Sequence, residues 1–531
     1  MRLLLKVFIA GVAAALLVAC GPPRDTIILI TATPPGGVVD LGGGDLAAAS
    51  AVAGSHQQDT AQQPVAPTPT FIPTPNPTRV AVIDTTQDQT YVVQPGDSLQ
   101  IIARQFGVAV ETVISANGFA DENQIIYPGQ SLIIPQDIQA TGPAFKIIPD
   151  SELVLSPGTQ GFSTAEFLRQ HGTSFLANYT EDVNGKLWTG AQIVDLIALE
   201  HSVNPRLLLA ALEYETHWIS QPMVDPDAAL YPMNYRELPG QVYGLYRQLD
   251  WAGKMLNTGY YGWRERGMTA TLLADGQRAA LDPTINAGTA GVDVWLSQTR
   301  TLNDWLVAVD HTGFFATYVN LFGDPFQYAI EPLIPPDLSQ PPMQFPFGVG
   351  ETWYFTGGPH GGWGSGTAWA AVDFVSDNAE NGCVPSSRFA RAVAAGVIAR
   401  SEYGVVILDL DGDGFEGTGW TVMYLHLATE GRAITVGQRV EAGDPIGYPA
   451  CESGVSFSTH LHLARRFNGE WMAADCTSCL LDAPSPPLNF SGWIASSFDS
   501  EYDGAFIRDD DYREACTCRE ALNTFLGPEG K

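Results

Sequence analysis

Two histidines separated by a single leucine, His460 and His462, have the clearest chemical potential near the C-terminal end of this 531-residue chain. If the stretch is a β-strand, both imidazoles lie on one face and Leu461 on the other, because side chains alternate along a strand. Two adjacent imidazoles on a rigid strand suit either a pair of metal ligands or one ligand beside a base. The pair alone is weak evidence, so its meaning depends on partners elsewhere.

Three further polar clusters precede this pair and contain His360, Asp373 and His426. They lie among short β-like runs separated by Gly-rich turns, which predicts an antiparallel sheet domain over residues 345–490. In order and kind, the clusters resemble the lysostaphin-like (LytM-type) zinc metallopeptidases, and the similarity covers about Gly348 to Asp475. Members of this family cleave peptide bonds in the stems or cross-bridges of peptidoglycan. The resemblance therefore implies a cell-wall-bound zinc metalloendopeptidase.

The resemblance also gives each of these residues a role. His360, Asp373 and His462 would hold one Zn²⁺ per peptidase domain, with the fourth position open for water. His460 would act as the general base, because it neighbours a ligand on the same strand face. His426, arriving from another strand, would orient water or stabilise the developing charge.

The spacing of the first two ligands departs from the family pattern. Three residues usually separate them, whereas twelve residues, most of them in a Gly-rich run, separate His360 from Asp373. An inserted loop could leave both ligands in place, reshape the substrate lip or abolish the metal site. The alternative prediction is therefore a catalytically inactive peptidoglycan-binding or regulatory lipoprotein.

An acidic stretch that begins at Asp409 resembles the start of a calcium loop. An EF-hand loop requires a glutamate at its twelfth position, where this chain has Trp420. We therefore favour an acidic hairpin turn between two strands over a Ca²⁺ site.

Residues 145–336 contain longer helical patterns, which predict an all-α middle domain. The stretch from Val203 to Thr216 is similar to the segment of lysozyme-like lytic transglycosylases that ends in a catalytic glutamate, and Glu215 matches that acid. A carboxylic acid among apolar neighbours can protonate a glycosidic oxygen. Glycan-strand cleavage through Glu215 is thus a second alternative function. Glu213 and Glu215 could equally be solvated helix residues.

Residues 91–136 form a compact pattern of strand, helix, helix and strand. The pattern closely resembles a LysM domain, a small α+β module, through both of its turns and its apolar helix positions. LysM domains bind glycans that contain N-acetylglucosamine, so the resemblance implies peptidoglycan as the ligand. By the family pattern, the sugar would lie against Gly96, Asp97 and Asn117.

The first residues have the organisation of an export signal. Arg2 and Lys6 precede an apolar run too short to span a bilayer, which predicts a signal peptide over residues 1–19. The run ends at Cys20 and resembles the lipobox of bacterial lipoproteins, in which this cysteine becomes the lipidated first residue. Residues 20–90 are rich in Pro, Thr, Gly and Ala and predict a disordered tether. These features imply a protein exported to the cell envelope and anchored to the membrane through Cys20.

Composition limits the partners and the redox state. The net charge is −31 with only 27 lysines and arginines, so no basic stripe exists to neutralise phosphates and nucleic acid is excluded as a partner.

Six cysteines besides Cys20 lie in the last third of the chain, which favours disulfides of open connectivity. The Cys476-Thr477-Ser478-Cys479 stretch could instead be half of a zinc knuckle, but a second pair with the right spacing is missing. Residues 491–531 lack a pattern and are expected to form a C-terminal tail packed on the peptidase domain.

Overall fold

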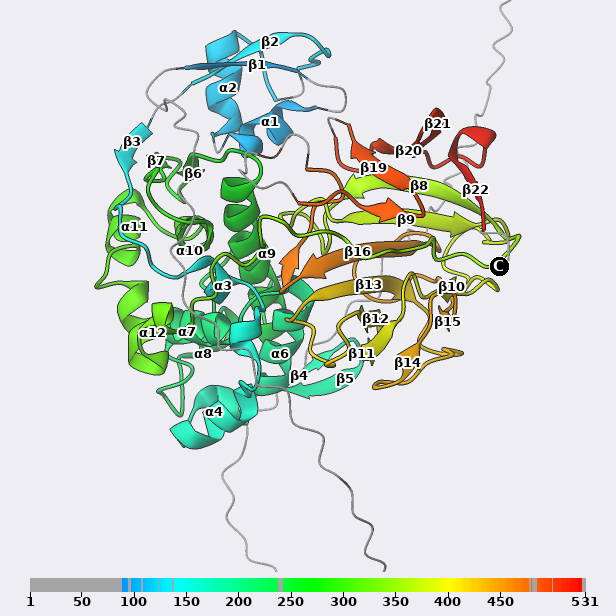
Figure 1. Ribbon diagram of the computed structural model, residues 1–531. Helices are drawn as coiled ribbons and strands as arrows, with labels where there is room; N and C mark the ends of the chain where they lie inside the picture. The colour runs from blue at the N-terminus through cyan, green and yellow to red at the C-terminus, as the bar shows by residue number, and fades with distance from the viewer. Residues whose placement is uncertain are drawn as a thin grey trace, which may run out of the picture.

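Figure 1 shows the computed structural model of the chain, in which a small N-terminal domain, a helical region and a β domain follow one another. It describes residues 88–93, 97–106, 108–122, 124–135, 138–236, 242–476, 479, 485–498 and 500–527. The expected signal peptide, Cys20 and nearly all of the expected tether lie outside these residues. Among the residues described, no helix is both long and apolar enough to cross a membrane.

The N-terminal domain has the element order expected from the sequence. It consists of β1 (Gln89–Val92), α1 (Leu99–Gln105), α2 (Val110–Asn117) and β2 (Ser131–Ile134), with β1 antiparallel to β2. Its apolar positions close a core of their own, which includes Leu99, Ile102, Val113, Leu132 and Ile134. Arg278 of the helical region donates hydrogen bonds to the carbonyls of Phe106 and Pro135, and so ties this domain to the rest of the molecule.

The middle region is predominantly helical, as the long helical periodicity predicts. Its helices are α3 (Asp150–Leu153), α4 (Thr164–His171), α5 (Phe175–Asn178), α6 (Gly190–His201), α7 (Pro205–Thr216), α8 (Pro226–Leu230), α9 (Leu245–Arg264), α10 (Ala287–Ser297), α11 (Leu302–Ala308) and α12 (Phe314–Phe322), with 3-10 turns η1 (Pro157–Thr159) and η2 (Pro325–Tyr328). The region also contains two small sheets that the sequence analysis did not predict. These are the hairpin β4 (Thr180–Val183) with β5 (Lys186–Thr189), and the sheet of β3 (Ile138–Thr141), β7 (Arg278–Ala280) and β6 (Ala270–Leu272).

Local sequence explains where the two central helices of this region begin. Thr189 and Gln192 form a capping box at the start of α6. The side chain of Asn204 caps α7, whose first residue is Pro205, a residue that lacks the N–H a first helical turn leaves unsatisfied. The two helices therefore start where the sequence places a polar cap before an apolar run.

The C-terminal domain is built on a large antiparallel sheet with the strand order β14-β11-β12-β13-β16-β9-β8-β22, and β17 pairs with β16. The strands are β8 (Thr352–His360), β9 (Ala371–Ser376), β11 (Gly396–Glu402), β12 (Gly404–Asp409), β13 (Trp420–Leu427), β14 (Arg439–Val440), β16 (Leu461–Phe467), β17 (Glu470–Trp471) and β22 (Thr524–Leu526). Beside it, β10 (Ala390–Arg391) pairs with β15 (Pro445–Gly447). Every residue of β12 and β13 is buried, so both faces of the sheet are covered at its centre.

The last residues, expected to be a patternless tail, have regular structure. Four strands, β18 (Asn489–Phe490), β19 (Trp493–Ser497), β20 (Gly504–Arg508) and β21 (Asp511–Glu514), make a small antiparallel sheet. After η3 (Ala521–Asn523), β22 joins the edge of the main sheet next to β8. Short strands separated by acidic and glycine-rich turns give little alternation, which is why the sequence did not reveal them.

All six cysteines of the last third are paired, as Cys383–Cys451, Cys476–Cys479 and Cys516–Cys518. The prediction of disulfides is confirmed. Because Cys476 and Cys479 are bonded to each other, their thiolates are not free for the zinc-knuckle alternative.

The helical region and the β domain share one apolar core. The β16–β17 hairpin places Trp471 against the helices, where its backbone N–H donates to the Tyr261 hydroxyl (2.8 Å) and its indole N–H donates to the His201 carbonyl (3.2 Å). The neighbouring Glu470 forms a buried ion pair with Arg264 at the end of α9 (2.6 Å). In Figure 1, α9 accordingly lies alongside the ends of the sheet strands. The two parts therefore pack as one unit around a shared core.

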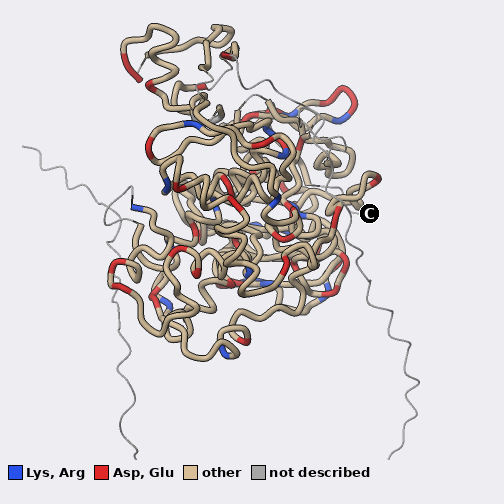
Figure 2. Tube along the Cα trace, turned by 90° about the vertical axis from the view of Figure 1, so that its left-hand side faces the viewer, with Lys and Arg blue, Asp and Glu red and all other residues tan. Residues whose placement is uncertain are grey.

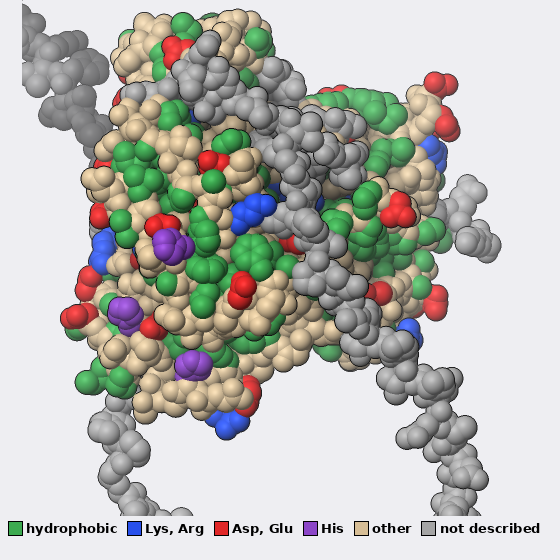
Figure 3. Space-filling view, turned by 60° about the vertical axis from the view of Figure 1, so that its left-hand side comes forward, with side chains coloured by type: hydrophobic (Ala, Val, Ile, Leu, Met, Phe, Trp, Pro, Cys, Tyr) green, Lys and Arg blue, Asp and Glu red, His purple; other side chains and the backbone are tan. Residues whose placement is uncertain are grey.

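Charged side chains are spread thinly over this unit. Figure 2 shows basic positions as isolated points along the described trace, with acidic positions more numerous. The space-filling view of the side formed by the helical region shows apolar and uncharged polar side chains intermixed, with few charges between them (Figure 3). Along the described trace, acidic positions are thus spread over many segments.

Candidate metal centre

Four neighbouring strands of the main sheet carry the histidines and the aspartate singled out in the sequence. His462 on β16 lies directly opposite Asp373 on β9 in the antiparallel register. His360, at the end of β8, lies opposite Ala371, two residues from Asp373 on β9. His426 lies on β13, the strand on the other side of β16. The sheet therefore brings together residues that are about a hundred positions apart in sequence.

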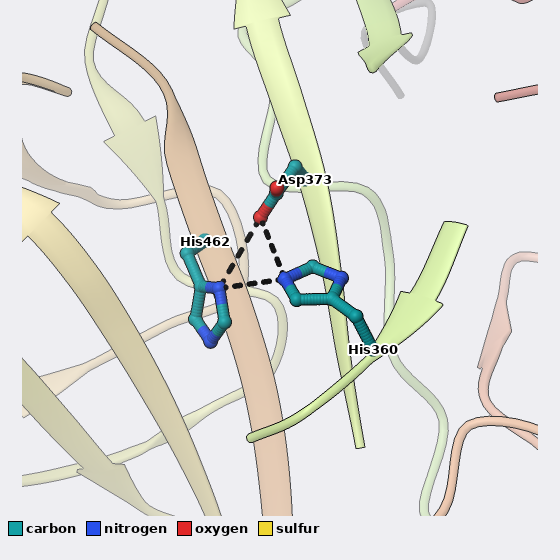
Figure 4. A group of neighbouring side chains, drawn as sticks. All are labelled: His360, Asp373 and His462. Atoms are coloured by element: carbon teal, nitrogen blue, oxygen red, sulfur yellow. Dashed lines mark hydrogen bonds and ion pairs between the residues drawn. The ribbon is translucent and has the colours of Figure 1, made fainter. Parts of the chain in front are cut away.

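The side chains of His360, Asp373 and His462 converge on one point (Figure 4). His360 Nε2 lies 3.0 Å from His462 Nδ1. Asp373 Oδ1 lies 3.4 Å from that His360 nitrogen and 3.2 Å from that His462 nitrogen. All three residues are buried. The ligand set expected from the sequence is thus assembled in space.

Hydrogen bonds on the outer side of each imidazole select its tautomer. His360 Nδ1–H donates to the Gly358 carbonyl (2.7 Å), and His462 Nε2–H donates to the Gly362 carbonyl (3.0 Å). The two inner nitrogens then both present lone pairs, because a neutral imidazole has one donor and one acceptor. Facing lone pairs repel each other unless a cation lies between them. Backbone carbonyls that orient ligand imidazoles in this way are a common feature of zinc sites.

Asp373 supports the same interpretation. Its Oδ1 atom is buried and has no hydrogen-bond partner among the described residues, a costly state for a carboxylate oxygen. Two imidazole lone pairs and a carboxylate oxygen that accepts no hydrogen bond from the described residues fit a divalent cation, and the donor set is consistent with zinc.

The twelve-residue segment between His360 and Asp373 forms a compact loop. Gly362 N–H donates to the Ala368 carbonyl (3.1 Å), and the side chain of Trp363 is buried in the shared core. Arg266, just after α9, donates to the carbonyls of Gly366 and Thr367. The long spacing therefore leaves the three candidate ligands together, and the helical region braces the loop whose Gly362 carbonyl orients His462.

His426 reaches the centre because its strand is bulged. Gly404 pairs with Leu427 and Val405 with Leu425, which leaves His426 as the extra residue of β13, and its φ of 64° lies in the left-handed region. Its ring centroid lies 4.5 Å from that of His460. Burial, together with the charges of His460 and His462, lowers the pKa of His426 to about 3, so this imidazole is neutral at physiological pH.

His460 is the more exposed of the two additional histidines and immediately precedes β16. Its Nδ1–H donates to the Ser458 carbonyl (2.8 Å), and its Nε2 lies 3.8 Å from Asp373 Oδ2. The expected neighbourhood of His460, beside the ligand cluster, is thus present. An imidazole with one nitrogen held by a carbonyl keeps the other free to accept a proton.

Tyr502, which the sequence analysis missed, stacks on His360 with ring centroids 4.1 Å apart and planes inclined by 21°. The turn between β19 and β20 carries it, and the turn is held because Gly358 N–H donates to the Tyr502 carbonyl (2.7 Å). Burial raises the pKa of Tyr502 to about 12, so the phenol remains a hydrogen-bond donor. It lies in the segment expected to be a tail, where no spacing linked it to the histidines.

Glu215, the candidate acid of the middle region, is enclosed at the end of α7. One carboxylate oxygen pairs with Arg300 (2.7 Å), the other accepts from Asn234 (2.8 Å), and the side chain is 2% exposed. Glu213 accepts hydrogen bonds from the backbone N–H groups of Ile219 and Ser220. Neither glutamate is therefore the solvated helix residue of the simpler interpretation.

The remaining expected residues have local roles where they are described. Asp97 accepts a hydrogen bond from Tyr91 (2.7 Å), and the Asn117 amide bonds the backbone of Ile133 in both directions, which joins α2 to β2. Gly96 and Cys20 lie outside the described residues. The acidic stretch forms a turn between β12 and β13, in which Asp409 accepts from backbone N–H groups of the turn.

Two family models match separate parts of the chain. Residues 91–135 match the LysM domain, and residues 146–337 match the LasA N-terminal domain. N-acetylmuramoyl-L-alanine amidase XlyA of Bacillus subtilis is 34% identical over 122 residues, which are 22% of this chain and 40% of the relative. An uncharacterized protein of Chlamydia pneumoniae is 43% identical over 49 residues, or 9% of this chain and 13% of the relative. The chain thus spans less than half the length of these curated relatives.

Solved structures of metallopeptidases are similar to parts of the chain. The M23 metalloprotease pseudoalterin from the deep sea matches with 20% identity and a TM-score of 0.27 over 33% of this chain and 96% of that chain. The catalytic domain of lysostaphin from Staphylococcus simulans matches with 25% identity and a TM-score of 0.16 over 23% of this chain and 86% of that chain. The chain thus joins a LysM domain and a LasA N-terminal domain to an antiparallel β domain that contains a buried His-Asp-His centre.

Proposed function

We propose that this protein is a cell-wall-bound zinc metalloendopeptidase that hydrolyses peptide bonds in the stems or cross-bridges of peptidoglycan. The observation that carries the proposal is the convergence of His360, Asp373 and His462, with two facing lone pairs and a carboxylate oxygen that accepts no hydrogen bond from the described residues. These three residues would hold Zn²⁺, which supplies a Lewis acid for the scissile carbonyl and a nucleophilic water.

The neighbouring side chains provide the proton transfers that peptide hydrolysis needs. His460 accepts the proton of the attacking water at Nε2, because its Nδ1–H is already donated to Ser458. The same nitrogen then returns the proton to the departing amine. His426 stays neutral and orients water or stabilises charge on the carbonyl oxygen. Tyr502, beside His360, offers a phenolic O–H to that oxygen.

The LysM domain would keep the peptidase on its substrate. LysM domains recognise peptidoglycan glycans, and XlyA, one curated relative, is by its name an amidase of the muramoyl-alanine bond. Binding the glycan raises the effective concentration of the attached peptides at the β domain. Export by the signal peptide of residues 1–19 and lipidation of Cys20 complete the proposal and would place the enzyme in the cell envelope.

Metal analysis and digestion of sacculi test the proposal. We expect one zinc per folded chain and new peptide ends in the muropeptide mass spectrum. His462→Ala should lose the zinc and lower cleavage by at least about 100-fold, because a missing ligand removes the metal's chemistry. The matched control His171→Ala changes an exposed histidine of α4 and should behave like the wild type. A folded wild-type chain without zinc would sink the proposal.

The same digest separates the alternatives drawn from the sequence. An inactive binding or regulatory lipoprotein would bind sacculi and release no fragments. Glycan cleavage through Glu215 would yield new sugar ends that disappear in Glu215→Gln, with peptide stems intact. Peptide ends that vanish in His462→Ala and persist in Glu215→Gln are the expected result.

A further inference from the structure

One short segment, residues 450–459, contacts the backbone of both histidines assigned to proton transfer. Ala450 N–H donates to the His426 carbonyl (2.6 Å), and His460 N–H donates to the Ala450 carbonyl (3.3 Å). A single residue of this segment thus bridges β13 to the start of β16. Any movement of the segment would move His426 and His460 together.

The same segment also orients both imidazoles. The Ser453 carbonyl accepts from His426 Nδ1–H (2.9 Å), and the Ser458 carbonyl accepts from His460 Nδ1–H (2.8 Å). These bonds select the tautomer in which each Nε2 is the free nitrogen. The proton-transfer capacity of the pair therefore depends on where residues 450–459 lie.

Little in the segment itself holds it in place. Val455 and Phe457, its large apolar side chains, are 82% and 90% exposed, so neither of them anchors the segment to the core. Ser453 adopts a left-handed backbone with φ of 62°, as does His426 with φ of 64°. Residues other than glycine adopt this region at a cost in free energy, and such conformations persist only where surrounding contacts enforce them.

Thr429 holds the segment between its two ends, because its N–H and its hydroxyl donate to the Glu452 carboxylate. The contacts at the two ends of the segment come from residues 382–384. Cys383 is bonded to Cys451 at the first end of the segment. The Gly382 carbonyl accepts from the N–H of Thr459, and the Val384 carbonyl accepts from its hydroxyl (2.8 and 2.6 Å), at the other end. The segment is thus pinned at both ends by the residues around one half-cystine.

The three candidate metal ligands are held differently. His360, Asp373 and His462 take their positions from the paired strands β8, β9 and β16 and from the carbonyls of Gly358 and Gly362. None of these contacts passes through residues 450–459. Loss of the Cys383–Cys451 bond should therefore disturb the proton-transfer histidines and spare the ligands.

We infer that the Cys383–Cys451 disulfide is a positioning device for His426 and His460, so that hydrolysis depends on its oxidised state while metal binding does not. The inference rests on the proposed function for its effect on hydrolysis. Cys383 is exposed and Cys451 half-buried, so a small reductant reaches the bond. Breaking a cross-link that closes a 68-residue separation frees the segment to leave its strained conformation.

Treatment of the full chain with a water-soluble phosphine tests the inference. The phosphine attacks one sulfur and leaves as its oxide with oxygen from water, and the two cysteines gain the two electrons and two protons. When peptide mapping shows Cys383 and Cys451 reduced, we expect kcat to fall by about 10- to 100-fold, the range of general acid–base catalysis. KM should change less than kcat, zinc should remain at one per chain, and reoxidation should restore activity.

Two double variants, each of which removes one disulfide, test the same inference without a reductant. Cys383→Ser/Cys451→Ser should reproduce the low kcat with zinc retained, whereas Cys516→Ser/Cys518→Ser, which removes a different disulfide, should leave kcat within about twofold of the wild type. Unchanged kcat after mapped reduction would overturn the inference. So would loss of zinc in step with activity, because the bond would then support the ligands. If the serine variant does not fold, reduction of the wild type decides.

An NMR readout keeps this test separate from that of the peptidase proposal. In the zinc-loaded, ¹³C-histidine-labelled chain, reduction should shift the ring signals of His426 and His460 and leave those of His360 and His462 in place. Histidine signals that all stay unchanged would reject the positioning role, even in a chain that cleaves peptidoglycan. Absence of cleavage by the oxidised chain, with the expected signal shifts, would reject only the peptidase proposal.

Discussion

The LysM domain closes its own small core, whereas the helical region and the β domain share one. Arg278 donates to two carbonyls at the LysM junction, whereas Trp471, Trp363 and Met472 of the β domain are packed among helices. A module that buries its own apolar face can be moved or removed without harm to its neighbours. Two modules that bury each other must fold together. The difference places the candidate metal centre in a part of the molecule that depends on the helices.

Separating the β domain from the helical region should have the largest effect on stability. A chain of residues 338–531 alone would expose Trp471 and the other β-domain members of the shared core, so we expect it to be insoluble or to lack cooperative unfolding. Circular dichroism and thermal unfolding of the purified fragment are the measurements. A soluble fragment that unfolds cooperatively at the temperature of the full chain would mean that the β domain needs no helical partner.

A single substitution where the helical region packs against the β domain should destabilise both of them at once. Trp471→Ala removes a side chain that is 1% exposed and should cost about 3 to 5 kcal/mol of unfolding free energy. Urea unfolding followed by helical and by aromatic signals should show one shifted transition. Leu187→Ala, at an exposed position of β5 (61% exposed), is the control and should change stability by less than about 0.5 kcal/mol. Two separate transitions in the tryptophan variant would contradict a shared core.

The free energy of unfolding should also depend on pH through Glu200 on α6, in the helical region. Burial, and then the charge of Asp250, raise the pKa of Glu200 from 4.5 to about 8. The native state therefore holds a proton that the unfolded chain has lost, so stability falls as pH rises from 4.5 through 8. Glu200→Gln removes this loss and should stabilise the protein by about 2 to 4 kcal/mol at pH 9 and little at pH 4. Urea unfolding at both pH values checks this, with the exposed Glu430→Gln as control; equal effects at both pH values would contradict it.

The sequence could predict the modules and the ligands but not how they fit together. Helical periodicity shows which face of α6 or α9 is apolar, yet it does not show whether a helix or a sheet covers that face. This is why residues 145–336 and 345–490 were expected as separate domains. The order of the elements of the LysM domain, which complete their own core locally, was predicted correctly.

The residues of the candidate site also divide into those that the sequence could predict and those that it could not. His360, Asp373 and His462 could be found from their order and kind, because a hydrolytic zinc needs such donors. Their convergence across the long loop depends on register shifts in β8, which no local pattern encodes. Tyr502 could not be found because it arrives from a different sheet, and its contact with His360 exists only in the folded chain.

Removing the LysM domain should have the smallest effect on stability and a clear effect on location. A chain of residues 138–531 keeps β3 and its parallel pairing with β7, and loses a domain held to the rest by Arg278. We expect its melting temperature to lie within about 2 °C of the full chain, because the shared core is intact. Its co-sedimentation with sacculi should be lost, since the glycan-binding module is gone. A fall in melting temperature of more than about 5 °C would show that the LysM domain stabilises the helical region and the β domain. The LysM domain would then not be structurally independent of them.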